Sequence, residues 1–125
     1  MRAVCLALPF TAVAPPAVAQ HLTGERLYQI CRDRTSAEWK EAGHWVCPSY
    51  IRGIIDGARL QALRDVGGSI PEHTRRLMIC DPATATGDEA IAIVVRFLDA
   101  RPETRRLPAA VVVFQALGEA WPCKP

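Results

Sequence analysis

The sequence has few of the features that catalysis and metal binding require. Its 125 residues include three histidines and contain no Cys-x-x-Cys pair, no His-Glu-x-x-His, no Gly-x-Ser-x-Gly and no glycine-rich phosphate loop. The acidic pair Asp88-Glu89 lies where a helix is predicted to begin, and the helix dipole favours negative charge at such a position. We therefore expect no catalytic residue, no metal site and no cofactor, and we predict that the protein is not an enzyme.

The sequence also lacks an apolar run long enough to span a bilayer. At its start, Arg2 precedes an apolar stretch over residues 3–14 that is too short for a membrane helix. The Ala-Val-Ala sequence at 17–19 has the small residues of a signal-peptide cleavage site. These features predict a signal peptide over residues 1–19. They also predict a mature domain over residues 20–125, periplasmic or secreted, with no membrane span after cleavage.

No strong excess of charge of either sign is present. The chain has 15 Lys and Arg residues and 13 Asp and Glu residues, and the predicted signal peptide contains one Arg and no acid. The mature domain is therefore close to neutral. Binding to nucleic acid or to an anionic membrane depends on a strongly basic surface, so the composition argues against both as main partners.

Cysteine is the reactive side chain that remains. Four cysteines follow the predicted signal peptide, and they are Cys31, Cys47, Cys80 and Cys123. An even number in a short exported chain indicates two disulfides, for which three pairings exist. Zinc is a weaker interpretation because 15 to 42 residues separate successive cysteines. Catalysis by Cys47 with His44 would need a free thiol, which export to an oxidising compartment disfavours.

The positions of the cysteines suggest one arrangement of the disulfides. A bond between Cys31 and Cys47 ties the first predicted helix to the start of the second, and the chain-entropy model gives it about 3 kcal/mol. A bond between Cys80 and Cys123 ties the region before the third helix to the end of the chain, with about 4 kcal/mol from the same model. This is the simplest arrangement of neighbours, and the other pairings stay open.

Hydrophobic spacing predicts four main helices joined by loops. The first follows Thr23 as its N-cap and turns Leu27, Ile30 and Cys31 to one face. Residues 32–46 come next and are polar and irregular. They predict a loop or a short helical turn.

The second predicted helix has two distinct faces. It begins with Pro48 in its first turn and ends at the glycine pair 67–68. Opposite its apolar side, Tyr50, Gly53 and Gly57 fall on one face by helical spacing. Because glycine destabilises a helix interior, these two glycines indicate that something approaches closely, either a neighbouring helix of the same domain or a second protein.

Two further helices are predicted in the last third of the chain. Thr86 and Glu89 form a capping box, and the apolar residues that follow keep helical spacing up to Pro102. The last helix starts at Pro108, and its predicted core face consists of Ala110, Val113, Phe114 and Leu117. A short helix over 72–78 is predicted in the preceding connection. The expected fold class is all-α, a small bundle of about four main helices cross-linked by two disulfides.

The order of these motifs resembles that of a known family. "TGERLYQIC", "CPSYIRGIIDGA" and "CDPATAT", followed by "AIVVRFLDARPETRRLPAAVVVFQALGEAWPC", are similar to the Rap/Tai family of immunity proteins for type VI secretion amidase effectors. The likeness covers residues 23–123. Its specific parts are Cys-x-x-Tyr-Ile-x-Gly at 47–53, Arg-Pro-Glu at 101–103 and an aromatic-Pro-Cys at 121–123. Trp121 stands where the family commonly shows Phe.

The resemblance implies a small α-helical periplasmic protein, cross-linked by its four cysteines and often a homodimer. Members of the family bind a peptidoglycan-cleaving amidase delivered by a neighbouring cell and block its active-site cleft. The implied partner is therefore an effector amidase, and the implied mechanism is occlusion without turnover. Two alternatives remain: an orphan family member with another protein partner, and a periplasmic helical stress chaperone.

Contacts with a partner are expected on loops, which no motif identifies. Our candidates are exposed aromatic and charged side chains in two predicted loops: Trp39, His44, Trp45, Glu72, His73, Arg75 and Arg76. The alternative is that these loops are simply solvated.

Overall fold

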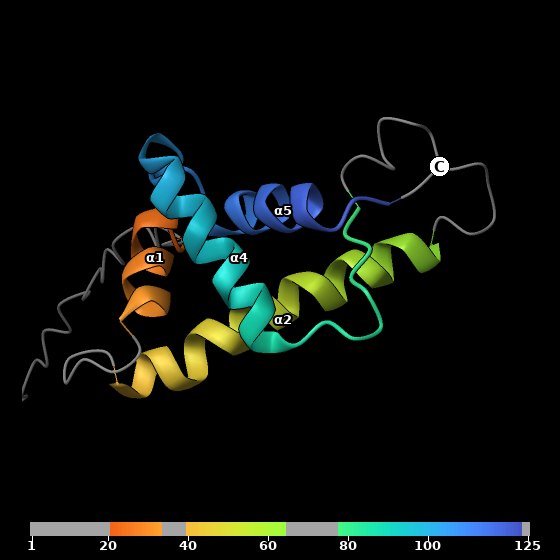
Figure 1. The fold of residues 1–125 in the computed structure, drawn as a ribbon, viewed down its shortest axis with the longest axis horizontal. Helices are drawn as coiled ribbons and strands as arrows, with labels where there is room; N and C mark the ends of the chain where they lie inside the picture. Colours follow the sequence, from red (N-terminus) through yellow and green to blue (C-terminus); the bar gives the residue numbers. More distant parts are fainter. Residues whose placement is uncertain (1–20, 34–39, 65–77, 124–125) are drawn as a thin grey trace, which may run out of the picture.

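The structure is a computed structural model that describes residues 21–33, 40–64 and 78–123 (Figure 1). These ranges form α1 (Gly24–Arg32), α2 (Lys40–Arg64), α4 (Gly87–Ala100), the 3-10 helix η2 (Pro102–Arg106) and α5 (Ala109–Ala120). In the described ranges, β-pairing is limited to two isolated bridges, Thr23 with Pro108 and Ile79 with Pro122. The all-α fold with four main helices is confirmed. The predicted signal peptide and almost all of the predicted helix over 72–78 lie outside the described residues.

Helix α1 begins where the capping rule predicts. The Thr23 hydroxyl accepts a hydrogen bond from the backbone N–H of Arg26 at 3.2 Å. Backbone bonds then tie this start to the start of α5, because the Gly24 N–H donates to the Leu107 carbonyl at 2.8 Å. A Cβ at Gly24 would lie 3.0 Å from the Arg105 carbonyl oxygen, so the close approach of η2 favours glycine at this position.

Helix α2 begins earlier than predicted. The expectation of a loop or a short helical turn over 32–46 is wrong from Lys40 onward, because one continuous helix starts there and carries Pro48 inside it. Proline in a helix interior removes one hydrogen bond and clashes with the preceding turn, which is why the sequence favoured a start at Pro48. Burial of Gly43 and of Cys47, which is 0% exposed, fixes the first turns against the core and outweighs that cost.

Helix α4 is the central element of the core. In Figure 1 it crosses the molecule, with its first turn beside α2, its middle near α5 and its last turns near α1. Its N-cap is Thr86, whose hydroxyl accepts from the Glu89 N–H at 3.2 Å, as the capping box predicts. Its buried residues are Ala90, Ile91, Ile93, Val94 and Leu98. Its apolar spacing therefore marks a buried helix and not a strand.

Helix α5 is present, but the residues on its buried face differ in part from the predicted ones. The buried residues are Ala109, Val112, Val113, Ala116 and Leu117, whereas the predicted core residues Ala110 and Phe114 are only half-buried. The helix is apolar on almost every side, so spacing alone does not fix which stripe faces the core.

The two disulfides differ in burial. Cys31 pairs with Cys47, with Cα atoms 5.3 Å apart, and both residues belong to the core. Cys80 pairs with Cys123, with Cα atoms 5.0 Å apart, nearer the surface. These are the pairs that the sequence favoured. Beside the second, Trp121 is buried and its carbonyl accepts from the Cys80 N–H at 3.0 Å.

Candidate functional site

The most apolar exposed surface of the described residues lies along α2. We call it the α2 outer face, and it consists of Trp45, Val46, Gly53, Gly57 and Leu60. Helical geometry places these residues within about a third of a turn of one another, opposite the side that enters the core. Trp45 is 68% exposed and Leu60 is 63% exposed. These exposed apolar side chains make the α2 outer face our candidate for a surface that another protein covers.

The aromatic end of this face includes two of the predicted partner-binding residues. His44 and Trp45 are both exposed, and their rings meet edge to face with centroids 4.9 Å apart. They lie on a helix and not in the predicted loop, so their backbone is fixed. Trp39 lies outside the described residues, as do Glu72, His73, Arg75 and Arg76, and their roles stay predictions.

The glycines of α2 face open space within the described part of the chain. A Cβ added at Gly53 or Gly57 would meet no atom within 4 Å. The interpretation that a neighbouring helix of the same domain packs there is therefore wrong for the helices described. A second protein, including a second copy of the chain, stays a prediction for this face.

Tyr50 lies at the border between the α2 outer face and α5. It is half-buried and packs against the core. Burial raises its pKa, while a backbone hydrogen bond from Ala110 in α5 lowers it to a smaller extent. Val111, the next residue of α5, is also an exposed apolar residue, with 41% of its surface accessible.

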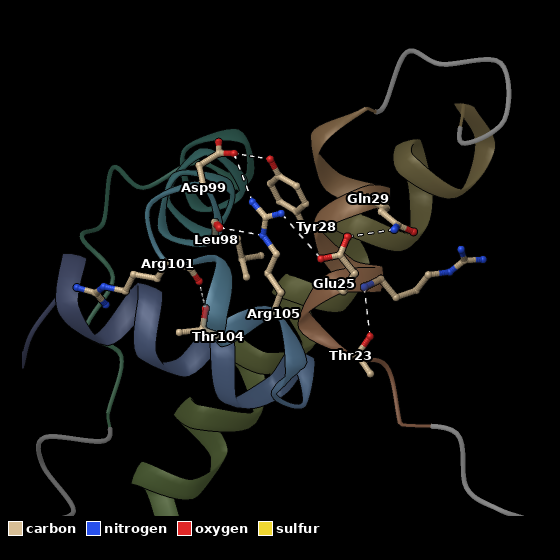
Figure 2. Close-up of polar contacts among 10 residues, drawn as sticks. Thr23, Glu25, Tyr28, Gln29, Leu98, Asp99, Arg101, Thr104 and Arg105 are labelled. Atoms are coloured by element: carbon tan, nitrogen blue, oxygen red, sulfur yellow. Dashed lines mark hydrogen bonds and ion pairs between the residues drawn. The ribbon is translucent and has the colours of Figure 1, made fainter.

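A polar cluster joins α1, the end of α4 and η2 (Figure 2). The Arg105 guanidinium carbon lies 3.8 Å from the centre of the Tyr28 ring, and its Nε donates to the Leu98 carbonyl at 3.0 Å. The Nη atoms of Arg105 lie 3.9 Å from the carboxylates of Glu25 and Asp99. Arg105 therefore connects three elements that are far apart in the sequence.

Tyr28 completes this cluster. Its hydroxyl donates to Asp99, and that hydrogen bond, with burial, raises the pKa of Tyr28. Sequence reasoning missed the cluster because it joins α1 to α4 and η2, and Tyr28 and Asp99 are 71 residues apart and form no local motif. No signal in a single sequence would have paired them.

The described residues offer little for a small ligand. An open cleft of about 550 Å³ is lined by Glu25, Tyr28, Gln29, Arg32, Asp33 and Arg105. Its lining includes both cationic and anionic side chains, so the cleft would not attract a ligand through a charge of one sign. A second cavity, between α2 and the start of α4, measures about 40 Å³, which is too small for a metabolite.

Metal chemistry also has no support in the described ranges. No group of three or more His, Cys, Asp or Glu side chains there is arranged to hold a metal ion. The four cysteines of the predicted mature domain are oxidised to disulfides and offer neither a thiolate ligand nor a nucleophile. Within the described ranges, the exposed apolar face of α2 is therefore a better candidate site than any cluster of reactive or metal-binding side chains.

Comparison with known proteins decides the family. The family model for Rap1a immunity proteins matches residues 23–123, which is most of the chain. The chain belongs to the Rap1a immunity protein family. Its family relationship implies that it binds a secreted effector protein. Immunity proteins of this kind inhibit and do not catalyse, so this Rap1a-family protein is not an enzyme. No curated protein and no solved structure matches the chain.

Proposed function

We propose that this Rap1a-family protein binds a secreted peptidoglycan amidase and inhibits it by covering the active-site cleft. The observation that carries the proposal is the family match over residues 23–123. A rigid helical scaffold supports it, since two disulfides and a continuous core fix the exposed side chains before the partner arrives. Occlusion needs only a complementary surface, so it is consistent with a protein that has no reaction centre of its own.

The periplasm is the proposed location. Disulfides persist in oxidising compartments, and the two pairs fit a protein outside the cytoplasm. The segment 1–19, which we propose as a signal peptide, would direct export. Among the described helices, none combines the length and apolar character needed to cross a bilayer. An immunity protein in this compartment would meet an amidase where peptidoglycan is exposed to it.

The aromatic end of the α2 outer face is the proposed contact with the amidase. Tryptophan is enriched among the residues that dominate binding energy, and Trp45 is both exposed and held on a helix. The His44 ring meets the Trp45 ring edge to face, so the two side chains would present one aromatic surface to the partner. The residues Glu72, His73, Arg75 and Arg76 remain candidates for a second contact.

An inhibition assay tests the proposal. Purified protein is added at rising ratios to peptidoglycan amidase effectors of secretion systems, and hydrolysis of peptidoglycan is measured. For the cognate enzyme, hydrolysis should stop near an equimolar ratio, and Trp45→Ala should weaken inhibition at least tenfold. Gln115→Ala, an exposed change on α5, is the matched control and should inhibit normally. Undiminished hydrolysis with every amidase, and no complex on a sizing column, would refute the proposal.

The glycine part of the α2 outer face is the proposed homodimer contact. Gly53 and Gly57 expose helix backbone that a second copy can approach closely. Analytical ultracentrifugation should find a dimer, and Gly53→Arg should convert it to a monomer with unchanged helix content. Gly87→Arg is the control, because Gly87 also faces open space but lies on α4. A wild-type monomer at high micromolar concentration would rule the dimer out.

A further inference from the structure

The two disulfides differ in how far an external thiol can reach them. Cys31 is 3% exposed and Cys47 is 0% exposed, and both are part of the core. Cys80 is exposed and Cys123 is half-buried. Thiol–disulfide exchange requires a thiolate to approach one sulfur directly. The Cys80–Cys123 bond is therefore accessible in the folded protein, whereas the Cys31–Cys47 bond becomes accessible only when the core opens.

Other contacts hold the chain around Cys80 in place without the disulfide. The Cys80 N–H donates to the Trp121 carbonyl, and the neighbouring Ile79 is buried and forms a bridge with Pro122. On the other side, Asp81 forms an ion pair with Arg59 of α2. Breaking the sulfur–sulfur bond therefore removes one link among several, and the helices can stay packed.

We propose that the Cys80–Cys123 disulfide is an exchange site for a protein dithiol oxidoreductase, which attacks Cys80 while the Cys31–Cys47 bond and the helical core stay intact. In the first step a thiolate of the oxidoreductase attacks Cys80 Sγ and forms a mixed disulfide. The Cys80–Cys123 bond breaks, and Cys123 leaves with the electron pair as a thiolate that then takes up a proton.

The second step returns both proteins to unlinked forms. The other thiolate of the oxidoreductase attacks its own sulfur in the mixed disulfide, and Cys80 leaves as a thiolate that is protonated. The oxidoreductase dithiol is thereby oxidised to a disulfide as Cys80 and Cys123 are reduced to thiols. With an oxidised partner the same steps run in reverse and form the bond.

Two features select Cys80 as the attacked sulfur. Cys80 is the more exposed of the pair, and its backbone is held by Trp121, so it presents a fixed target. Cys123 is half-buried, so an incoming thiolate reaches its sulfur less readily, and it is the sulfur that leaves.

A trapping experiment tests this assignment. The purified oxidised protein is incubated under native conditions with a thioredoxin-type oxidoreductase whose resolving cysteine is replaced by serine, so that the mixed disulfide accumulates. Peptide mass spectrometry should find the adduct at Cys80, at least tenfold more than at Cys31 and Cys47 together. Circular dichroism should show unchanged helix content. The Cys80→Ser/Cys123→Ser double variant is the control and should form no adduct.

Two further arms separate the alternatives. Replacing the oxidoreductase with glutathione at the same thiol concentration should give slower exchange at the same bond. Exchange with glutathione that is as fast as with the oxidoreductase, or faster, would overturn the assignment of a protein dithiol. Urea below the unfolding transition should accelerate reduction of Cys31–Cys47 and leave the Cys80–Cys123 rate nearly unchanged. Equal reduction of both bonds without urea, or an adduct mainly at Cys123, would overturn the proposal.

Discussion

The Cys31–Cys47 and Cys80–Cys123 disulfides close loops of different length in different surroundings. The first spans 16 residues and lies in the core, and the second spans 43 residues and lies near the surface. Loop entropy of the unfolded chain gives about 3 kcal/mol to the first and about 4 kcal/mol to the second. Burial in the folded protein gives the opposite order, because Cys31–Cys47 is packed in the core and Cys80–Cys123 is not. The comparison separates what a disulfide does to the unfolded chain from what it does to the native core.

The largest effect is expected from removing the buried pair. The double variant Cys31→Ala/Cys47→Ala should lower the free energy of unfolding by about 5 kcal/mol, because packing of two buried sulfurs is lost as well as loop entropy. Urea unfolding at neutral pH, followed by circular dichroism, measures the change. A loss smaller than that of the surface pair would show that loop entropy dominates.

Removing the surface pair should cost less than its loop length suggests. For Cys80→Ala/Cys123→Ala we expect a loss of about 3 kcal/mol, below the entropic value, because residue 123 regains freedom in the native state once the bond is gone. The same urea titration measures it. Hydrogen exchange of the Cys80 amide should accelerate at the same time, while amides of α4 should stay protected.

The polar cluster around Tyr28 makes a smaller contribution to the free energy of unfolding. It involves α1, the helix that also carries Cys31 of the buried disulfide. Tyr28→Phe removes the hydrogen bond to Asp99 and should cost about 1 kcal/mol at pH 7. Because the pKa of Tyr28 is raised in the folded state, this stability is complete below the ordinary tyrosine pKa of about 10 and is lost as pH rises through the folded value. Urea titrations at pH 7 and at alkaline pH should show the variant losing less stability than the wild type. An identical alkaline loss would contradict this.

The ion pair between Arg59 and Asp81 lies next to the more exposed disulfide, because Asp81 directly follows Cys80. Arg59→Gln should cost about 0.5 kcal/mol in the oxidised protein, because the pair is partly exposed. The cost should grow when Cys80–Cys123 is reduced, since the pair is then one of the remaining anchors of the segment. Arg52→Gln, which loses only a pair within α2, is the matched control. Equal costs in both redox states would show that the anchors act independently.

The smallest effect concerns Glu119, near the end of α5. Arg101 forms two hydrogen bonds with its carboxylate, at 2.8 and 2.9 Å, and lowers its pKa. The stabilisation is therefore present above the unfolded glutamate pKa of about 4.3 and is lost as pH falls through the lower folded value. NMR titration should find the Glu119 pKa raised in Arg101→Gln. An unchanged pKa would show that solvent screens the pair completely.

Local signals predicted much of this fold. Both N-caps, Thr23 and Thr86, lie where their hydroxyls were expected, because a cap depends on residues within one turn of it. The cysteine count predicted two disulfides, since oxidation depends on the compartment and not on tertiary detail. These features need no knowledge of what packs against them.

The errors arose where tertiary contacts override local preference. Pro48 opposes a helix interior, yet burial of Cys47 on the preceding turn keeps α2 continuous. The buried stripe of α5 is set by α4, and an almost wholly apolar helix does not reveal it. In the candidate site, exposure of Trp45 was predicted, but the open space at Gly57 required the arrangement of all the helices.

Both isolated β-bridges contain a proline, Pro108 in one and Pro122 in the other. Proline has no backbone N–H to donate, so neither bridge can grow along that residue into a longer ladder. An unpaired strand edge invites pairing between molecules and leads to aggregation. The chain thus uses extended backbone to join distant segments, and at these two bridges it offers neighbouring molecules no template for strand pairing.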